Sequence, residues 1–196
     1  ERRRLELGDG PIGDLSDLME RQGIRMAAVS LPDDISGITV QDPEAGVFVA
    51  VNKTHSTTRQ RFSMAHEYAH VLLDSDGAVS IVSRGGNRTD LSEIRANAFA
   101  AVFLMPERGL RRFVQGLGKG QPGRSEARIF DETDVTRVRR RAKPHSQEIQ
   151  IYDLVVAAHR FGASTIATLF RMQNLGLVND DQRQELQDDI DRGLDK

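Results

Sequence analysis

The pattern of apolar and polar positions changes along the chain, from short stretches near its start to longer periodic segments afterwards. The early stretches are rich in β-branched residues and are separated by turn residues such as Pro43 and Gly46, which predicts strands joined by tight connections. Three strands so close in sequence predict a small antiparallel or mixed sheet. The expected strands are residues 24–31, 35–40 and 46–52.

From Thr57 onward, apolar positions recur every three or four residues, which predicts helices. Thr57 or Thr58 is expected to cap the first long helix, which continues to Leu73. Residues 74–90 are rich in Ser, Gly, Asp and Asn and are expected to form a loop. Pro106 ends the next helix. The expected helices are residues 14–21, 57–73, 92–105, 107–117, 147–160, 164–173 and 180–191.

A sheet followed by packed helices predicts an α+β fold. With 196 residues, the chain is long enough for one large domain, or for a compact domain with a helical appendage. We expect residues 1–120 to form the core and residues 121–196 to form a C-terminal helical segment packed on it. Two helices of that segment have the form of a helix-turn-helix, with Gly162 at the turn and Ser164 as the second cap. Such pairs are more often structural than DNA-reading.

Composition narrows the class of protein. Hydrophobic residues make up 38% and charged residues 29%, as in soluble globular proteins, and the longest apolar stretches are too short to span a bilayer. No secretion signal is recognisable, so we expect a cytoplasmic protein without a membrane partner. The chain has no Cys, which excludes disulfides, thiolate zinc sites and cysteine nucleophiles. Any metal must therefore be held by His and carboxylate side chains.

The candidate chemistry lies in the motif His66-Glu67-Tyr68-Ala69-His70. Two His residues four apart on a helix lie about 40° apart around its axis, so both imidazoles can bind one divalent cation. Glu67 follows the first His and can reach the open position of the metal without ligating it. There it can take a proton from a water whose acidity zinc has raised. The motif predicts a zinc-dependent peptidase.

Such a site needs a third protein ligand, and two carboxylates are candidates. Asp76 lies six residues after His70, but Leu73 stands where a Gly would support the sharp turn that this spacing requires. Glu93 lies near the start of the next helix, where Asn97, one turn on, can orient a ligand. The spacing favours Glu93 over Asp76. Glu93 could also serve only to complement the helix dipole.

A run of basic residues lies between positions 137 and 143. This basic run is typical of a solvated helix face, and its alternative interpretation is a phosphate-binding patch for nucleic acid. A peptidase also needs a group that stabilises the developing oxyanion, and the spacing selects neither His145 nor Tyr152 for this role. His55 is interpreted as a loop residue and His159 as a packing residue. The basic residues of the run are Arg137, Arg139, Arg140, Arg141 and Lys143.

Residues 59–70 and 93–106, with Asn52 at the end of the third expected strand, resemble the ImmA/IrrE family of metallopeptidases. The resemblance implies a minimal zincin-like core, consisting of a three-stranded sheet and the active-site helix. It also implies His66, His70 and Glu93 as the metal ligands. Members of the family cleave helix-turn-helix repressors and so induce stress, mobile-element or defence genes.

The leading hypothesis is therefore a zinc endopeptidase with Glu67 as the catalytic residue and a helix-turn-helix repressor as its substrate. Two His and one carboxylate would also accept manganese or iron. Nucleic acid is left open as an activator or co-ligand. The alternative hypothesis is a non-proteolytic, zinc-containing DNA-binding or regulatory module, although a purely structural zinc site has no need of a base such as Glu67.

Overall fold

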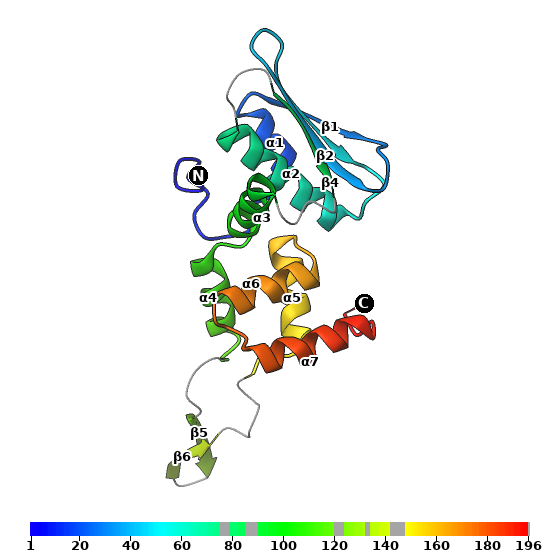
Figure 1. Cartoon of the computed structure of the whole chain (residues 1–196). Coiled ribbons are helices and arrows are strands. Elements are labelled where there is room, and N and C mark those ends of the chain that lie inside the picture. The colour runs from blue at the N-terminus through cyan, green and yellow to red at the C-terminus, as the bar shows by residue number, and fades with distance from the viewer. Residues whose placement is uncertain (75–78, 85–89, 120–123, 132–133, 142–147, 196) are drawn as a thin grey trace.

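The computed structural model describes residues 1–74, 79–84, 90–119, 124–131, 134–141 and 148–195. A sheet with helices packed against it lies at the top of the view in Figure 1, and a second group of helices lies below it. The expected α+β class is confirmed. Within the described ranges, no helix is long and apolar enough to cross a lipid bilayer.

The sheet is mixed and has four strands in the order β1-β3-β2-β4. Strand β1 runs parallel to β3, and the other neighbouring pairs are antiparallel. The expectation of a three-stranded sheet was wrong, because β4 lies inside the segment expected to be a loop. Strand β4 is short and flanked by turn-forming residues, so its own sequence pattern does not predict a strand. It is a strand because it pairs with the free edge of β2. The strands are β1 (Ile24–Val29), β2 (Ile35–Asp42), β3 (Gly46–Asn52) and β4 (Val79–Arg84).

Helix α2 (Thr57–Leu73) packs against β2 and β3 and carries the HExxH motif. Its N-cap is Ser56, whose hydroxyl accepts from the Arg59 amide at 3.4 Å, so the expectation of Thr57 or Thr58 as the cap was wrong by one or two positions. The side chains from Ala65 to His70 are all buried. The motif therefore lies between the sheet and the rest of the molecule.

Helix α3 (Leu91–Leu104) lies beside α2, and this contact is the main link between the motif and the following helices. Its N-cap is Asp90, which accepts from the Ser92 amide at 2.9 Å. Ala96 and Ala100 are buried on α3, and such small residues allow two helix axes to approach closely. The neighbouring helices in sequence are α1 (Leu15–Glu20) and α4 (Glu107–Gly116).

The C-terminal helices are α5 (Ile151–Phe161), α6 (Thr165–Asn174) and α7 (Asp180–Asp191). The turn between α5 and α6 has the expected chemistry: Gly162 adopts a left-handed conformation (φ 63°), and the Ser164 hydroxyl accepts from the Ala167 amide at 3.2 Å. Buried residues of α5 to α7 belong to the same hydrophobic core as those of α1 to α4. The division into residues 1–120 and 121–196 stays a prediction.

The segment between α4 and α5 contains a two-stranded ribbon, formed by β5 (Arg124–Asp131) and β6 (Asp134–Arg141). The interpretation of the basic run as a helix face was therefore wrong. Arginine accepts either secondary structure, whereas the β-branched Val135, Thr136 and Val138 favour a strand.

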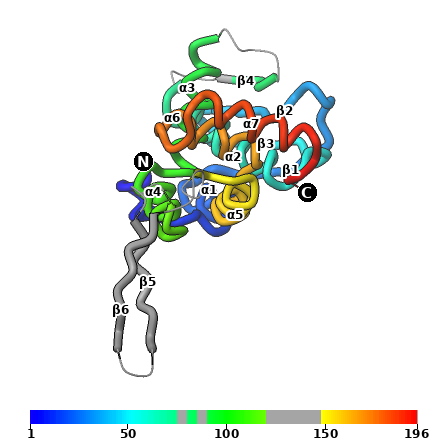
Figure 2. The backbone as a smooth tube through the Cα atoms, turned by 90° about the horizontal axis from the view of Figure 1, so that it is seen from below, coloured from blue at the N-terminus to red at the C-terminus, as the bar shows by residue number. Residues whose placement is uncertain are grey.

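The first residues of the chain run beside α4 (Figure 2). Asp9 pairs with Arg112 at 3.5 Å, and its backbone carbonyl lies directly over Gly109. At the start of the segment, the Glu1 carboxylate accepts a hydrogen bond from the Tyr68 hydroxyl of α2. The N-terminal segment therefore contacts both the motif-bearing helix α2 and helix α4.

Candidate metal centre

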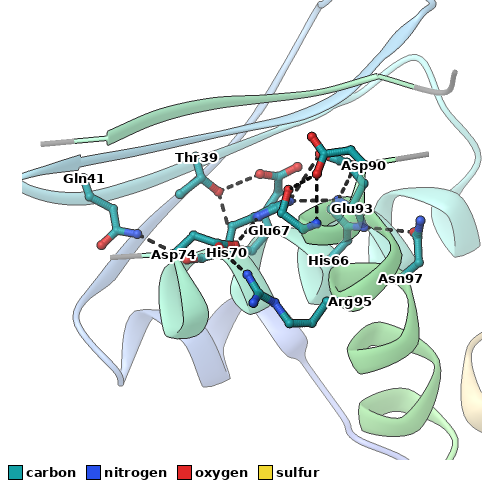
Figure 3. A network of polar contacts seen from close by, with 11 residues as sticks. Thr39, Gln41, His66, Glu67, His70, Asp74, Asp90, Glu93, Arg95 and Asn97 are labelled. Atoms are coloured by element: carbon teal, nitrogen blue, oxygen red, sulfur yellow. Dashed lines mark hydrogen bonds and ion pairs between the residues drawn. The ribbon is translucent and has the colours of Figure 1, made fainter. Parts of the chain in front are cut away.

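Three buried side chains converge between α2 and α3 (Figure 3). His66 and His70 project from consecutive turns of α2, and Glu93 projects from the first turn of α3. Their ligand atoms all lie within 4.8 Å of one another, and the three side chains are the only group of this kind in the described part of the chain. The structure thus brings together the three residues expected to bind metal.

The distances within this group suit a small tetrahedral cation. Zinc binds imidazole nitrogen and carboxylate oxygen at about 2.0–2.2 Å, so two of its tetrahedral ligands lie about 3.4 Å apart. The two Nε2 atoms of His66 and His70 are 3.1 Å apart. Glu93 places one carboxylate oxygen 3.2 Å from His66 Nε2 and the other 3.5 Å from His70 Nε2. The donor set therefore fits zinc.

The partners of the other imidazole nitrogens support the same conclusion. His70 Nδ1 lies 2.8 Å from Asp74 Oδ2, and His66 Nδ1 lies 3.0 Å from Asn97 Oδ1. Both oxygens are acceptors, so the hydrogen of each neutral ring is on Nδ1 and each Nε2 carries a lone pair. Two lone pairs facing each other repel, and a cation between them would satisfy both.

Asp74 is a part of the site that the sequence interpretation did not assign. It lies one helical turn after His70 and also forms an ion pair with Arg95 of α3. A carboxylate that accepts from the second nitrogen of a ligating His fixes the ring orientation and raises its basicity. The spacing of four residues between His70 and Asp74 was the signal that could have identified it.

Glu67 is fully buried and lies under the sheet rather than within the group of three. Thr39 Oγ1 of β2 donates to Glu67 Oε2 at 2.6 Å, and Glu67 Oε1 has no hydrogen-bond partner among the described residues. Burial raises the pKa of Glu67, while the hydroxyls of Ser83 and Thr39 oppose this change. Ser83 Oγ is buried and has no hydrogen-bond partner among the described residues.

Burial also changes the acidity of the expected ligands. It lowers the pKa of His66 to about 4, with a smaller contribution from neighbouring His70, against the opposing effect of the Asn97 hydrogen bond. His66 is therefore neutral at pH 7 and can coordinate metal without first losing a proton. Burial raises the pKa of Glu93, an effect that the nearby His70 opposes. A bound cation would favour the carboxylate form of Glu93 and lower its pKa.

The remaining candidates differ in position. Asp76 and His145 lie outside the described residues. Tyr152 is at the start of α5, and 73% of its surface is exposed. His55 lies in the loop before α2, as expected. His159 lies in the last turn of α5 and is exposed, so its interpretation as a packing residue was wrong.

The candidate DNA-reading helix α6 is largely engaged within the protein. Thr168 is fully buried and donates to Ser164 O at 2.9 Å. Arg171 Nε donates to Met105 O at 3.1 Å, and Gln173 donates to Asp180 at 2.8 Å. These three polar residues of α6 therefore have partners in this fold, which favours a structural role for the helix pair.

Comparison with known proteins places the same residues in a peptidase context. The model of the M78 peptidase family, described as the IrrE N-terminal-like domain, matches residues 19–121. The radiation response metalloprotease IrrE of Deinococcus radiodurans is 31% identical over 99 residues. That stretch is 48% of this chain but only 29% of the relative, so the chain spans less than a third of the relative's length. The matched family region contains the motif and both helices of the candidate site.

Proposed function

Because the chain belongs to the metallopeptidase family of IrrE N-terminal-like domains, we propose that it is a zinc endopeptidase whose ligands are His66, His70 and Glu93. The observation that carries the proposal is the convergence of these three side chains at tetrahedral spacing, with both histidines oriented by acceptors on Nδ1. The donor chemistry also suits manganese or iron.

Different residues of the chain would have different roles in the proposed reaction. A bound metal would act as a Lewis acid, polarising the scissile carbonyl and acidifying the attacking water. Glu67 would take a proton from that water as the water oxygen bonds to the carbonyl carbon. The same proton would then pass to the leaving nitrogen as the C–N bond breaks. Asp74 and Asn97 would hold the two imidazoles in place throughout.

The proposed substrate is a helix-turn-helix transcriptional repressor, cleaved in the cytoplasm to induce stress, mobile-element or defence genes. The support for this step is the family resemblance of the motif segments. The relative from Deinococcus radiodurans is named for a radiation response, which is consistent with a regulatory role but says nothing of a substrate.

The metal site is tested by metal analysis of the purified chain and of His70→Ala and Glu93→Ala. We expect one zinc per chain in the wild type and loss of zinc from both variants. Zinc retained in Glu93→Ala would move the third ligand to another carboxylate, with Asp76 as the next candidate. A wild-type chain that takes up no metal even after zinc is added would contradict the peptidase proposal.

Proteolysis is tested by incubating the zinc-loaded chain with helix-turn-helix repressors from the same genome. Glu67→Gln is the matched variant, because it keeps the shape of the side chain and removes the base. We expect the wild type to cleave one repressor at a defined bond and the variant to bind zinc without cleaving. Cleavage by Glu67→Gln at the wild-type rate would contradict the assignment of Glu67.

We also infer a second candidate function, binding of nucleic acid, from the register of the ribbon. In the register of the ribbon, Arg124 is paired with Arg141 and Arg128 with Arg137, while Arg139 is paired with Glu126. Like charges directly opposite each other destabilise a ribbon, and phosphate groups would relieve this repulsion.

The test is the salt dependence of binding to a fluorescent 20-base-pair duplex. Five phosphate contacts give a slope of about −4.5 for log affinity against log salt concentration, and a triple Arg→Gln variant on β6 should reduce its magnitude by about 2.7. The control carries three exposed Arg→Gln changes elsewhere on the chain. Equal slopes for the two variants would contradict binding through the ribbon. The substituted residues are Arg137, Arg139 and Arg141 in the variant, and Arg21, Arg112 and Arg192 in the control.

A further inference from the structure

The inner face of β2 lies against the motif-bearing helix and meets it at successive positions. Gly37, Thr39 and Gln41 occupy every second position of the strand, so they share this face, and all three are buried. Gln41 Nε2 donates to His70 O at 3.4 Å. A Cβ atom at Gly37 would meet Glu67 Oε1 most closely and would lie only 2.8 Å from Glu67 Cγ and Cδ. The absence of a side chain at Gly37 therefore leaves room for Glu67, and Gln41 binds the backbone of α2 one turn further on.

The two carboxylate oxygens of Glu67 have different environments. Oε2 accepts a 2.6 Å hydrogen bond from Thr39, which is fully buried. Oε1 is buried and has no hydrogen-bond partner among the described residues. A buried polar atom without a partner is costly and is often found where a ligand or reactant binds. The asymmetry points to Oε1 as the working oxygen (Figure 3).

We propose that Thr39 is a positioning residue, which anchors Oε2 of Glu67 so that Oε1 is the atom that takes the proton from the attacking water. This inference rests on the proposed peptidase function, since it assigns a role to a neighbour of the proposed base. In this step a water O–H bond breaks and the proton bonds to Oε1. The water oxygen bonds to the carbonyl carbon as the C=O π bond breaks, and its electron pair moves to the carbonyl oxygen. The proton later leaves Oε1 for the nitrogen of the departing amine.

The physical reason for such an anchor is the freedom of a glutamate side chain. Glutamate has three rotatable bonds, and its carboxylate can also rotate by half a turn and exchange its two oxygens. Gly37 allows the carboxylate to lie close to the sheet, and the Thr39 hydroxyl then selects one orientation. A catalytic base held in the productive geometry needs no reorganisation at the moment of proton transfer.

A purely structural role for Thr39 is the competing explanation, because its hydroxyl also lies 3.4 Å from Glu67 O and could simply join β2 to α2. The two explanations differ in what the loss of the hydroxyl affects. If it only joins the elements, Thr39→Val changes stability without changing how Glu67 meets a ligand. If it positions the base, the effect depends on the presence of the Glu67 carboxylate.

The test uses acetohydroxamic acid, a small bidentate metal chelator whose acidic proton is accepted by a carboxylate beside the metal. Its binding to the full chain loaded with cobalt is followed by the visible absorption of the metal. The variants are Thr39→Val, Thr39→Ala, Thr39→Ser, Glu67→Gln and the double variant Thr39→Val/Glu67→Gln. Cobalt stoichiometry and thermal unfolding are measured for each variant.

We expect Thr39→Val to bind the hydroxamate ~10-fold to 100-fold more weakly, the range for loss of a hydrogen bond to a charged group. Thr39→Ser keeps the hydroxyl and should bind as the wild type does. Adding Thr39→Val to Glu67→Gln should cause little further loss, because the anchored carboxylate is already gone. Thr39→Ala should reproduce the loss if the valine variant does not fold.

Two outcomes overturn the inference. Wild-type affinity in Thr39→Val or Thr39→Ala shows that the hydroxyl does not position the base. A loss in the double variant equal to the sum of the two single losses shows that Thr39 acts independently of Glu67. Wild-type affinity in Glu67→Gln would instead remove Glu67 from the site, which is a failure of the proposed function and is distinguishable from the first two results.

Discussion

At the scale of single residues, the site depends on close neighbours that orient the reactive groups. The histidines are fixed by acceptors on Nδ1, and the glutamate is fixed by a hydroxyl and by the absence of a side chain at Gly37. Each of these neighbours can be altered without touching the reactive group itself. Two predictions follow from this arrangement.

Replacing Gly37 by Ala should impair catalysis while leaving metal content unchanged. The added methyl group would collide with Glu67 Oε1, Cγ and Cδ and displace the carboxylate, whereas His66 and His70 would keep their positions. A misplacement of about 1 Å can reduce a rate about 100-fold. Repressor cleavage and zinc stoichiometry are the measurements. Gly13→Ala is the control, since a Cβ there meets nothing within 4 Å, and equal cleavage by both variants would contradict the prediction.

Replacing Asp74 by Asn should weaken zinc binding. An amide can turn its NH₂ group toward His70 Nδ1, which would place the ring hydrogen on Nε2 and block coordination in that tautomer. Loss of such a partner typically costs ~10-fold to 100-fold in metal affinity. Competition with a chromophoric chelator measures this affinity. The exposed Asp33→Asn should bind zinc as the wild type does, and an unchanged affinity in Asp74→Asn would count against the orienting role.

At the scale of secondary-structure elements, the position of α2 depends on the loops at the end of β3. Asn52 is fully buried at this end and joins three segments of backbone. Its side chain donates to Leu31 O and Pro32 O, both at 3.1 Å, and to Ile35 O at 3.0 Å. Its oxygen accepts from the Thr54 amide at 3.1 Å. Asn52 therefore fixes the start of β2 and the approach to α2.

Replacing Asn52 by Ala should lower the free energy of unfolding by about 3 kcal/mol, because several buried backbone groups lose their partner. Asn52→Asp keeps the acceptor oxygen and loses the NH₂ donors, so it should also destabilise the fold. Urea unfolding measures both, and the slope of the transition should stay as in the wild type. A loss below about 0.5 kcal/mol in Asn52→Ala would show that other groups or water replace the hydrogen bonds.

At the scale of the whole molecule, the helical C-terminal part and the metal-bearing part share one core. Leu169 and Met172 of α6 are fully buried in the same cluster as Met105 and Leu110. Arg111 of α4 also donates to Leu175 O at 2.8 Å. A change in the C-terminal helices should therefore reach the metal site through stability, although these helices contribute no ligand.

Replacing Leu169 by Ala should lower the free energy of unfolding by about 2–5 kcal/mol through the cavity that it leaves. Release of zinc and loss of helix signal should shift together, because unfolding of a shared core is cooperative. Phe170→Ala is the matched control, since the adjacent Phe170 is 46% exposed. Zinc release that stays at its wild-type midpoint while the helix signal shifts would show two independently unfolding units.

The sequence by itself determined the features that lie within one element. The spacing of His66 and His70 fixes a shared helix face whatever surrounds it, and the spacing of Glu93 and Asn97 does the same on α3. Strand and helix existence followed from apolar periodicity, with bounds within a few residues of those observed. The ribbon was missed because arginine does not distinguish a helix from a strand, and β4 because a short strand takes its pairing from its neighbour.

Only the tertiary structure decided which elements meet. Thr39 and Gly37 are about thirty residues from Glu67, and nothing in their spacing predicts that β2 lies over that side chain. Register along a strand decides this contact, because a shift of one residue would turn Thr39 away from the helix. The approach of Glu93 to His66 likewise depends on the packing of α3 on α2. Side-chain periodicity is a local property, whereas register and helix packing are set by the core as a whole.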